Sequence, residues 1–146
     1  MSEARNPSKI TAEEFELAIR FGIPMMNTFS FRMECLEAGY ARLRMQFDER
    51  HVRPGGTIPG PLLVMVADAA LYAMVMSVLG MELLAVTSNL NIHFLRKPSP
   101  VDVIGEATLI RHGRKNIVGQ VLLYSDGESE PIAHVTSSYA LPSNGR

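Results

Sequence analysis

The sequence predicts an α+β fold in which a long antiparallel sheet curves around one central helix. Residues 62–79 are apolar apart from Asp68 and Ser77, so a helix formed there has no polar side to turn toward water. Six other segments alternate apolar and polar residues, which is typical of strands. One flat sheet face cannot cover the whole circumference of such a helix, whereas a sheet that wraps around it can. Any apolar surface left over predicts a second subunit.

Length and composition bound the class of protein. The chain has 146 residues, of which 47% are hydrophobic and 20% charged, as is ordinary for one globular domain. We expect a helical extension over 1–26, a core over 27–140 and a tail over 141–146. The net charge of −1 argues against a general nucleic-acid binder. Cys35 is the one cysteine and the N-terminus carries no apolar signal segment, so we expect a cytoplasmic protein without an intrachain disulfide.

The first elements are a short helix and a hairpin. Thr11 and Glu14 have the spacing of a capping box, which predicts an amphipathic helix over 12–21 that ends at Gly22 and Pro24. Two runs of period two follow, over 28–37 and 39–49, and they predict a β-hairpin with its turn at 38–39. The first of these strands is expected to place four apolar residues on one face: Phe29, Phe31, Met33 and Cys35.

A loop rich in glycine and proline then leads into the central helix. Pro61 suits the first helical turn, Gly80 is a stop signal, and the helix is expected from Pro61 to Leu79. The rest of the chain predicts four more strands, at 87–96, 101–111, 115–125 and 131–141.

The central helix has a membrane alternative, because residues 62–79 are near the lower length limit of a spanning segment. A carboxylate at its centre is unfavourable in lipid. The following segment carries Glu82 and no basic flank. The sequence therefore favours a buried helix of a protein without a membrane partner.

Asp68 is the residue that most needs an explanation. An ionised carboxylate in apolar surroundings is costly unless it is paired, hydrogen-bonded or protonated. Residues with that cost are candidates for function. The alternative is a structural carboxylate that is hydrogen-bonded to a neighbouring strand.

Residues 27–140 resemble the hotdog-fold thioesterases, and specifically the phenylacetate-pathway (PaaI-like) type of acyl-CoA thioesterase. The signature of that family runs Asn-x-x-Gly-x-x-His-Gly-Gly, six further residues and Asp-x-Ala on the central helix. Aligned on "ADAA", Asp68 stands at the family's Asp, Arg53 at its Asn and Gly56 at its first Gly. Residues 59–61, "PGP", stand in place of His-Gly-Gly.

The resemblance implies an acyl-CoA thioesterase acting on medium-chain or aryl acyl groups, with a role for each of four residues. Asp68 would be the general base for water or the nucleophile on the thioester, and the sequence leaves both roles open. The N–H of Gly60 would polarise the thioester oxygen, Thr87 would contact the catalytic water, and Arg53 is expected to take over part of the positioning. Because the family's Asn and His are absent, a non-catalytic acyl-CoA binder is the alternative.

The substrate's coenzyme A is expected to meet basic residues beside predicted turns, where Arg offers bidentate contacts to phosphate. A solvated turn is the alternative for any one of them. These residues are Arg111, Arg114, Lys115 and Arg96. No separate cofactor is expected, since coenzyme A is part of the substrate and no dinucleotide or nucleotide-phosphate motif is present. No metal is expected, because neither His93 nor His134 has a metal-like spacing to another ligand.

A hotdog dehydratase is a further alternative. His51 precedes the Pro59–Gly60 pair by the spacing that such dehydratases use. Their carboxylate position falls at Met65, and a thioether cannot act as an acid or base. Asp68 lies nearly one turn further along the helix.

Assembly follows from geometry as well as from resemblance. Gly60 and Asp68 are eight residues apart on one helix, a rise of about 12 Å. An oxyanion donor and a base that act on one carbon must both lie within a few ångströms of it. We therefore expect a homodimer with sites shared between two antiparallel helices, or a dimer of such dimers.

Overall fold

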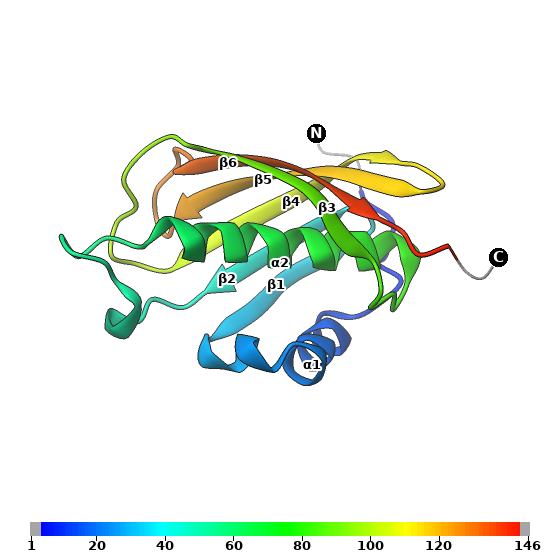
Figure 1. The fold of residues 1–146 in the computed structure, drawn as a ribbon, viewed down its shortest axis with the longest axis horizontal. Helices are drawn as coiled ribbons and strands as arrows, with labels where there is room; N and C mark the ends of the chain where they lie inside the picture. The colour runs from blue at the N-terminus through cyan, green and yellow to red at the C-terminus, as the bar shows by residue number, and fades with distance from the viewer. Residues whose placement is uncertain (1–3, 144–146) are drawn as a thin grey trace.

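The computed structural model describes residues 4–143 as one curved antiparallel sheet with a long helix, α2, across one face (Figure 1). This confirms the predicted fold class. The ends of the expected extension and tail, residues 1–3 and 144–146, lie outside the described residues. The elements are α1 (Ala12–Gly22), η1 (Pro24–Thr28), β1 (Phe31–Glu37), β2 (Tyr40–Met45), η2 (Glu49–His51), α2 (Gly60–Leu79), β3 (Val86–Phe94), β4 (Val103–His112), β5 (Asn116–Ser125) and β6 (Ala133–Ala140).

The sheet has six strands in the order β1-β2-β4-β5-β6-β3, and all neighbours are antiparallel. The first strand after α2 therefore does not pair with the strand before it. Instead β3 runs to the far edge and pairs with β6, the last strand of the chain (Figure 1). This crossover brings the start of β3 beside the end of β6 and over α2.

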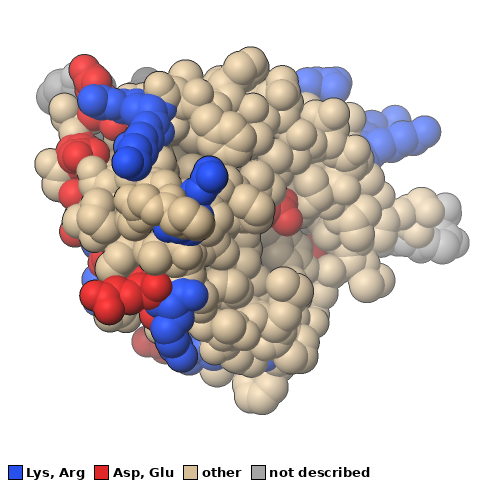
Figure 2. Space-filling view, turned by 60° about the vertical axis from the view of Figure 1, so that its left-hand side comes forward, with Lys and Arg blue, Asp and Glu red and all other residues tan. Residues whose placement is uncertain are grey.

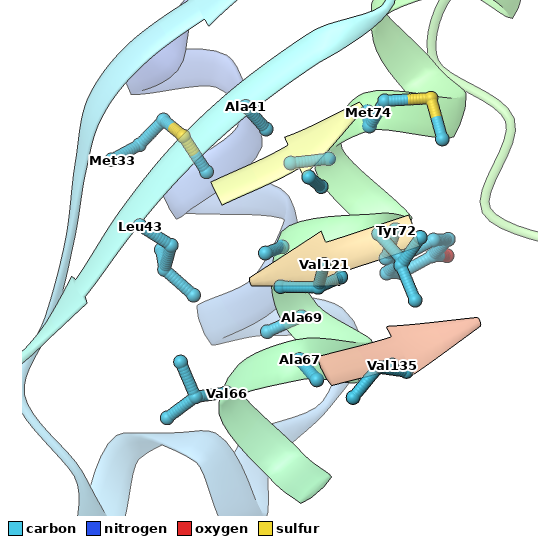
Figure 3. Packing of buried hydrophobic residues seen from close by; sticks show 14 of the residues in the cluster. Met33, Ala41, Leu43, Val66, Ala67, Ala69, Tyr72, Met74, Val121 and Val135 are labelled. Carbon is cyan, nitrogen blue, oxygen red and sulfur yellow. The ribbon is translucent and has the colours of Figure 1, made fainter. Parts of the chain in front are cut away.

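The central helix is buried on all sides along its second half, because every residue from Ala69 to Ser77 is buried. Figure 3 shows side chains of α2 among those of β1, β2, β5 and β6. By length and composition, α2 is also the one helix within residues 4–143 that qualifies to cross a membrane, but here it forms the core of the fold. The helix ends as predicted at Gly80, whose φ is 97°.

The N-terminal helix is attached next to the middle of α2. Its capping box is formed as predicted, with the Thr11 hydroxyl accepting from the Glu14 N–H at 3.0 Å. Phe15 is buried and meets the ring of Tyr72 edge-on, with the ring centroids 6.2 Å apart. The Glu16 carboxylate accepts a hydrogen bond from the backbone of β1. The extension is thus packed onto the core rather than separate from it, with α1 beside the turn of α2 that carries Asp68.

The expected alternation of β1 is wrong at Cys35. The pairing of β1 with β2 shifts register between Met33 and Cys35, which marks a β-bulge. After the bulge Cys35 lies opposite Arg42, on the outer face, and Leu36 instead packs against the core. A strict period of two cannot anticipate an inserted residue.

The strand β3 is exposed along most of its length. Only Leu90 and Ile92 are partly buried, and the other residues of β3 are exposed. Val86 and Phe94, at its two ends, are 58% and 55% exposed. The strand has a free edge and little cover on its faces in the single chain.

We predict that Gly119→Ala lowers the free energy of unfolding by about 1–3 kcal/mol. Gly119 of β5 faces α2, and a Cβ added there would lie 2.5 Å from Met74 Cε and 2.9 Å from Leu71 Cδ2. Overpacking forces those side chains to move. Urea unfolding of both proteins measures the difference.

Gly22→Ala is the matched control, because a Cβ at Gly22 meets nothing within 4 Å. It is expected to be neutral or to stabilise by up to about 1 kcal/mol, since alanine favours a helix. Equal stabilities of Gly119→Ala and the parent protein would contradict the tight contact between α2 and β5.

Candidate active site

Asp68 is half-buried on α2, and its carboxylate is hydrogen-bonded by two hydroxyl groups. The Thr87 hydroxyl of β3 donates to Asp68 Oδ1 at 2.7 Å. The Tyr139 hydroxyl of β6 also donates to Oδ1 at 2.7 Å, and it lies 3.1 Å from the backbone oxygen of Asp68. The cost of placing a carboxylate in an apolar helix is therefore offset by charge-assisted hydrogen bonds.

The sheet brings the two hydroxyl groups together. Thr87 lies directly opposite Tyr139 in the antiparallel pairing of β3 with β6, so both side chains leave the sheet on the same side. The register shifts between Thr87 and Asn89, which leaves Ser88 as the extra residue of a β-bulge. The bulge reverses the alternation, so Thr87 points to the same side as Leu90, which packs against the core.

Tyr139 is a site residue that the sequence did not reveal. Its side chain is 3% exposed and its ring stacks on Tyr72, with centroids 5.9 Å apart. Burial, with the nearby charge of Asp68, holds the pKa of Tyr139 far above its ordinary value, so its hydroxyl remains a protonated donor. The residues around it alternate like any strand, and only the β3–β6 register indicates its proximity to Asp68.

A pocket of about 460 Å³ opens beside the Asp68 carboxylate. Its walls come from the end of α1, from α2, from the segment 83–87 and from β6, and most are apolar. The Tyr72 hydroxyl donates to the backbone oxygen of Leu83 at 2.7 Å, which ties this segment to α2. The lining residues are Ala18, Gly22, Ile23, Asp68, Tyr72, Leu83, Leu84, Ala85, Val86, Thr87 and Tyr139. An apolar group with a reactive polar end fits this arrangement, with the polar end at Asp68.

The first turn of α2 presents one free backbone donor. Pro59 and Pro61 have no N–H, and the N–H groups of Leu62 and Leu63 both point to the Pro59 oxygen, at 3.1 and 3.4 Å. Within the described part of the chain, the Gly60 N–H donates to no other residue. It lies at the positive end of a 20-residue helix, where an anion is favoured.

Gly60 and Asp68 are not brought together within one chain. They are separated by two turns of α2, about 12 Å along the helix axis. The neighbour of Gly60 is Phe94 at the other end of β3, whose ring would lie 3.2 Å from a Cβ at that position. The predicted donor and the predicted base therefore occupy opposite ends of the exposed strand.

Arg53 is exposed in the loop that precedes α2. The loop is closed by backbone bonds from the Arg53 N–H to Thr57 and from the Gly56 N–H to Arg53, at 2.9 and 3.0 Å. Gly56 has a φ of 75°, which favours glycine there. Among residues 4–143 no side-chain hydrogen bond or ion pair holds the Arg53 guanidinium.

The basic residues fall into two places. Three of them are exposed at the β4–β5 turn, at the end of the sheet where β3 begins with Val86 and Thr87: Arg111, Arg114 and Lys115. Within the described chain none of the three forms an ion pair. Arg96 follows the opposite end of β3 and pairs with Glu130. Figure 2 shows one face of the molecule as a broad area with few charges, with most charged side chains toward its margins and acidic atoms visible in a hollow within it.

The histidines lie apart from Asp68. His51 rests on the ring of Phe29, with centroids 4.8 Å apart, and His134 is hydrogen-bonded to Gln120 at 3.1 Å. In the part of the chain that the structure describes, no three His, Cys, Asp or Glu side chains gather as metal ligands would.

The family model of the Thioesterase superfamily matches residues 55–132, a span that contains Gly60, Asp68 and Thr87. A crystal structure from Silicibacter sp. TM1040, provisionally named a thioesterase, is 36% identical with a TM-score of 0.82, over 97% of this chain and 95% of that one. A provisionally named esterase of Saccharolobus solfataricus is 31% identical over 120 residues, or 80% of this chain and 77% of the relative.

The E. coli PaaI protein from the phenylacetic acid degradation operon has the same fold at 17% identity, with a TM-score of 0.78 over 90% of this chain and 93% of that one. The fold, the position of Asp68 on the core helix and the match over 55–132 agree with one another. The chain belongs to the Thioesterase superfamily and has the hotdog fold.

Proposed function

We propose that this protein hydrolyses acyl-CoA thioesters with medium-chain or aryl acyl groups to a free acid and coenzyme A. The observation that carries the proposal is the Asp68 carboxylate, held by two hydroxyl groups at the edge of a largely apolar pocket. Membership of the Thioesterase superfamily supports the reaction class. The proposed location of this reaction is the cytoplasm.

Asp68 could promote hydrolysis of a thioester by either of two mechanisms. As a general base it takes a proton from water, whose oxygen attacks the thioester carbon. The C–S bond then breaks, and the thiolate recovers the proton as coenzyme A leaves. As a nucleophile its carboxylate oxygen attacks the carbon directly and expels coenzyme A, and water then hydrolyses the mixed anhydride.

The oxyanion of either route requires a donor, and we assign it to Gly60 of a second chain. The Gly60 N–H is free and lies at a helix N-terminus, where a developing negative charge is stabilised. Two copies of α2 packed antiparallel about a two-fold axis would place Gly60 of one chain near Asp68 of the other. Arg53 is exposed in the loop that leads into Gly60, and we assign it part of the positioning of the substrate.

The exposed strand β3 supports this homodimer. A free strand edge is a ready site for pairing with another chain, and β3 spans the distance between Gly60 at one end and Thr87 at the other. Leu84 and Val86, next to the pocket, are 72% and 58% exposed, and a partner would cover them. A dimer of dimers extends the same proposal.

A non-catalytic acyl-CoA binder is the second candidate. Arg53 and Pro59 replace the Asn and His that usually surround the thioester, and neither can make the same hydrogen bonds. Release of free thiol from a panel of acyl-CoA esters of graded chain length, with aryl members, separates the two candidates. Binding of the panel without thiol release would identify a binder and contradict hydrolysis.

We predict that Asp68→Asn lowers turnover of the best substrate by about 10²- to 10⁴-fold. The amide keeps the shape of the carboxylate but is neither a base nor a nucleophile. Thiol release measures the loss, and thermal unfolding checks that the fold persists. Parental turnover in Asp68→Asn across the panel would rule out both routes.

We predict that replacing Arg111, Arg114 and Lys115 with alanine raises KM for acyl-CoA and leaves kcat nearly unchanged. The three charges lie on an exposed turn and would contact the phosphates rather than the reacting carbon. The salt dependence of KM should weaken in parallel. Arg32→Ala, an exposed arginine on β1, is the control. An unchanged KM in the triple variant would show that the turn is merely solvated.

We predict that mixing Asp68→Asn with Gly60→Leu restores activity that each lacks alone. A mixed dimer holds one intact site and one doubly damaged site, so random exchange should recover about one quarter of the parental activity. Differently tagged chains confirm the exchange. Confirmed exchange without recovered activity would contradict the shared site.

A further inference from the structure

The two oxygens of the Asp68 carboxylate are in different surroundings. Oδ1 accepts from both the Thr87 and the Tyr139 hydroxyl groups, each at 2.7 Å. Within the described residues, Oδ2 accepts no hydrogen bond. A carboxylate with one oxygen anchored twice cannot rotate about its last bond without losing both hydrogen bonds. The anchoring therefore distinguishes the two atoms before any substrate binds.

We propose that Tyr139 is a positioning residue that, with Thr87, anchors Oδ1 so that Oδ2 is the reacting oxygen of Asp68. The inference rests on the proposed hydrolysis and adds a residue and an atom to it. In the base route Oδ2 receives the proton from water, and in the nucleophile route Oδ2 forms the bond to the thioester carbon.

The surroundings of Tyr139 suit it to this role. Its hydroxyl contacts both the carboxylate and the backbone oxygen of Asp68, at 2.7 and 3.1 Å, so it is fixed relative to the helix itself. Its ring is held by the stacked ring of Tyr72, and Tyr72 is tied by its own hydroxyl to Leu83. Thr87 is exposed whereas Tyr139 is 3% exposed, so Tyr139 is the more buried of the two anchors.

Tyr139 acts as a hydrogen-bond donor and not as an acid. Burial and the neighbouring Asp68 charge raise the pKa of Tyr139 far above the range in which the enzyme would work. Its proton is therefore not transferred in the reaction. Loss of the hydroxyl should change the rate of the chemical step without adding or removing an ionisation from the pH profile.

The test is Tyr139→Phe, which removes the hydroxyl and keeps the ring. We expect kcat for thiol release to fall about 10- to 100-fold, the range of a hydrogen bond to a charged group. KM should stay within about twofold, and the shape of the kcat profile between pH 5 and 9 should be unchanged. A purely structural tyrosine would instead lower the melting temperature and leave kcat at the parental value.

Substitutions of Thr87 test the anchoring of Asp68 Oδ1 independently of Tyr139. Thr87→Val should lower kcat in the same way, and Thr87→Ser should regain most of the loss, because serine keeps the hydroxyl. The loss in the double variant Tyr139→Phe/Thr87→Val should differ from the product of the single losses, since both groups contact one atom. If Tyr139→Phe does not fold, equal kcat values for Thr87→Val and Thr87→Ser would overturn the proposal.

Tyr40→Phe is the matched control. The Tyr40 hydroxyl donates to the Glu106 carboxylate at 2.7 Å on β2 and β4, on the face of the sheet away from α2. It has the same bond type without contact to the site, so kcat should not change. If the parent protein is active and Tyr139→Phe has the same kcat, the positioning role of Tyr139 is overturned while the proposed hydrolysis stands. No thiol release by the parent protein would overturn the proposed function, and this inference with it.

Discussion

The fold depends on covering α2, a helix that has no polar side. Each fully buried side chain of leucine or methionine contributes about 1.5–3 kcal/mol relative to an exposed one, and Ala69 to Ser77 are all buried. The strands achieve this only because the sheet approaches closely at small residues. At Gly105 and Gly119 an added Cβ would lie within 3.2 Å of side chains of α2. The crossover of β3 to the far edge completes the cover near the middle of the helix.

Asp68 is the one charged residue of α2. The strands that partly bury its carboxylate, β3 and β6, also provide the hydroxyl groups that donate hydrogen bonds to it. The side of α2 at Asp68 faces the β3–β6 edge, where Thr87 and Tyr139 are cross-strand neighbours. A hydroxyl pair at this edge compensates the desolvated carboxylate without a cation. No ion pair within residues 4–143 involves Asp68, so its side-chain partners there are hydroxyl dipoles alone.

The sequence predicted those features that depend on residues close together in the chain, such as the ends of the helices. Thr11 and Glu14 indicated the start of α1, Pro61 and Gly80 indicated the bounds of α2 to within a residue, and Asp68 was identified by its cost. Tyr139 was missed because its importance comes from the β3–β6 pairing, which joins segments about fifty residues apart.

The β-bulge in β1 explains the misjudged face of Cys35, and the β-bulge in β3 determines the face of Thr87. Each inserts one residue, and every later side chain of that strand then points to the opposite side. In β1 the bulge moved Cys35 out and Leu36 in. In β3 the bulge at Ser88 turned Thr87 toward Asp68. A pattern of period two has no signal for such an insertion.

The sequence "PGP" at residues 59–61, which replaces the family's His-Gly-Gly, changes the hydrogen-bond donors at the start of α2. Two prolines around Gly60 remove both neighbouring N–H groups, and Pro59 accepts from the next two. The helix N-terminus is thereby reduced to one donor with a backbone fixed on either side. A side-chain donor such as histidine is lost, but the remaining N–H has no competing partner within residues 4–143. Because that donor and Asp68 lie at opposite ends of β3, the proposed mechanism requires a second chain to bring the two groups to one thioester.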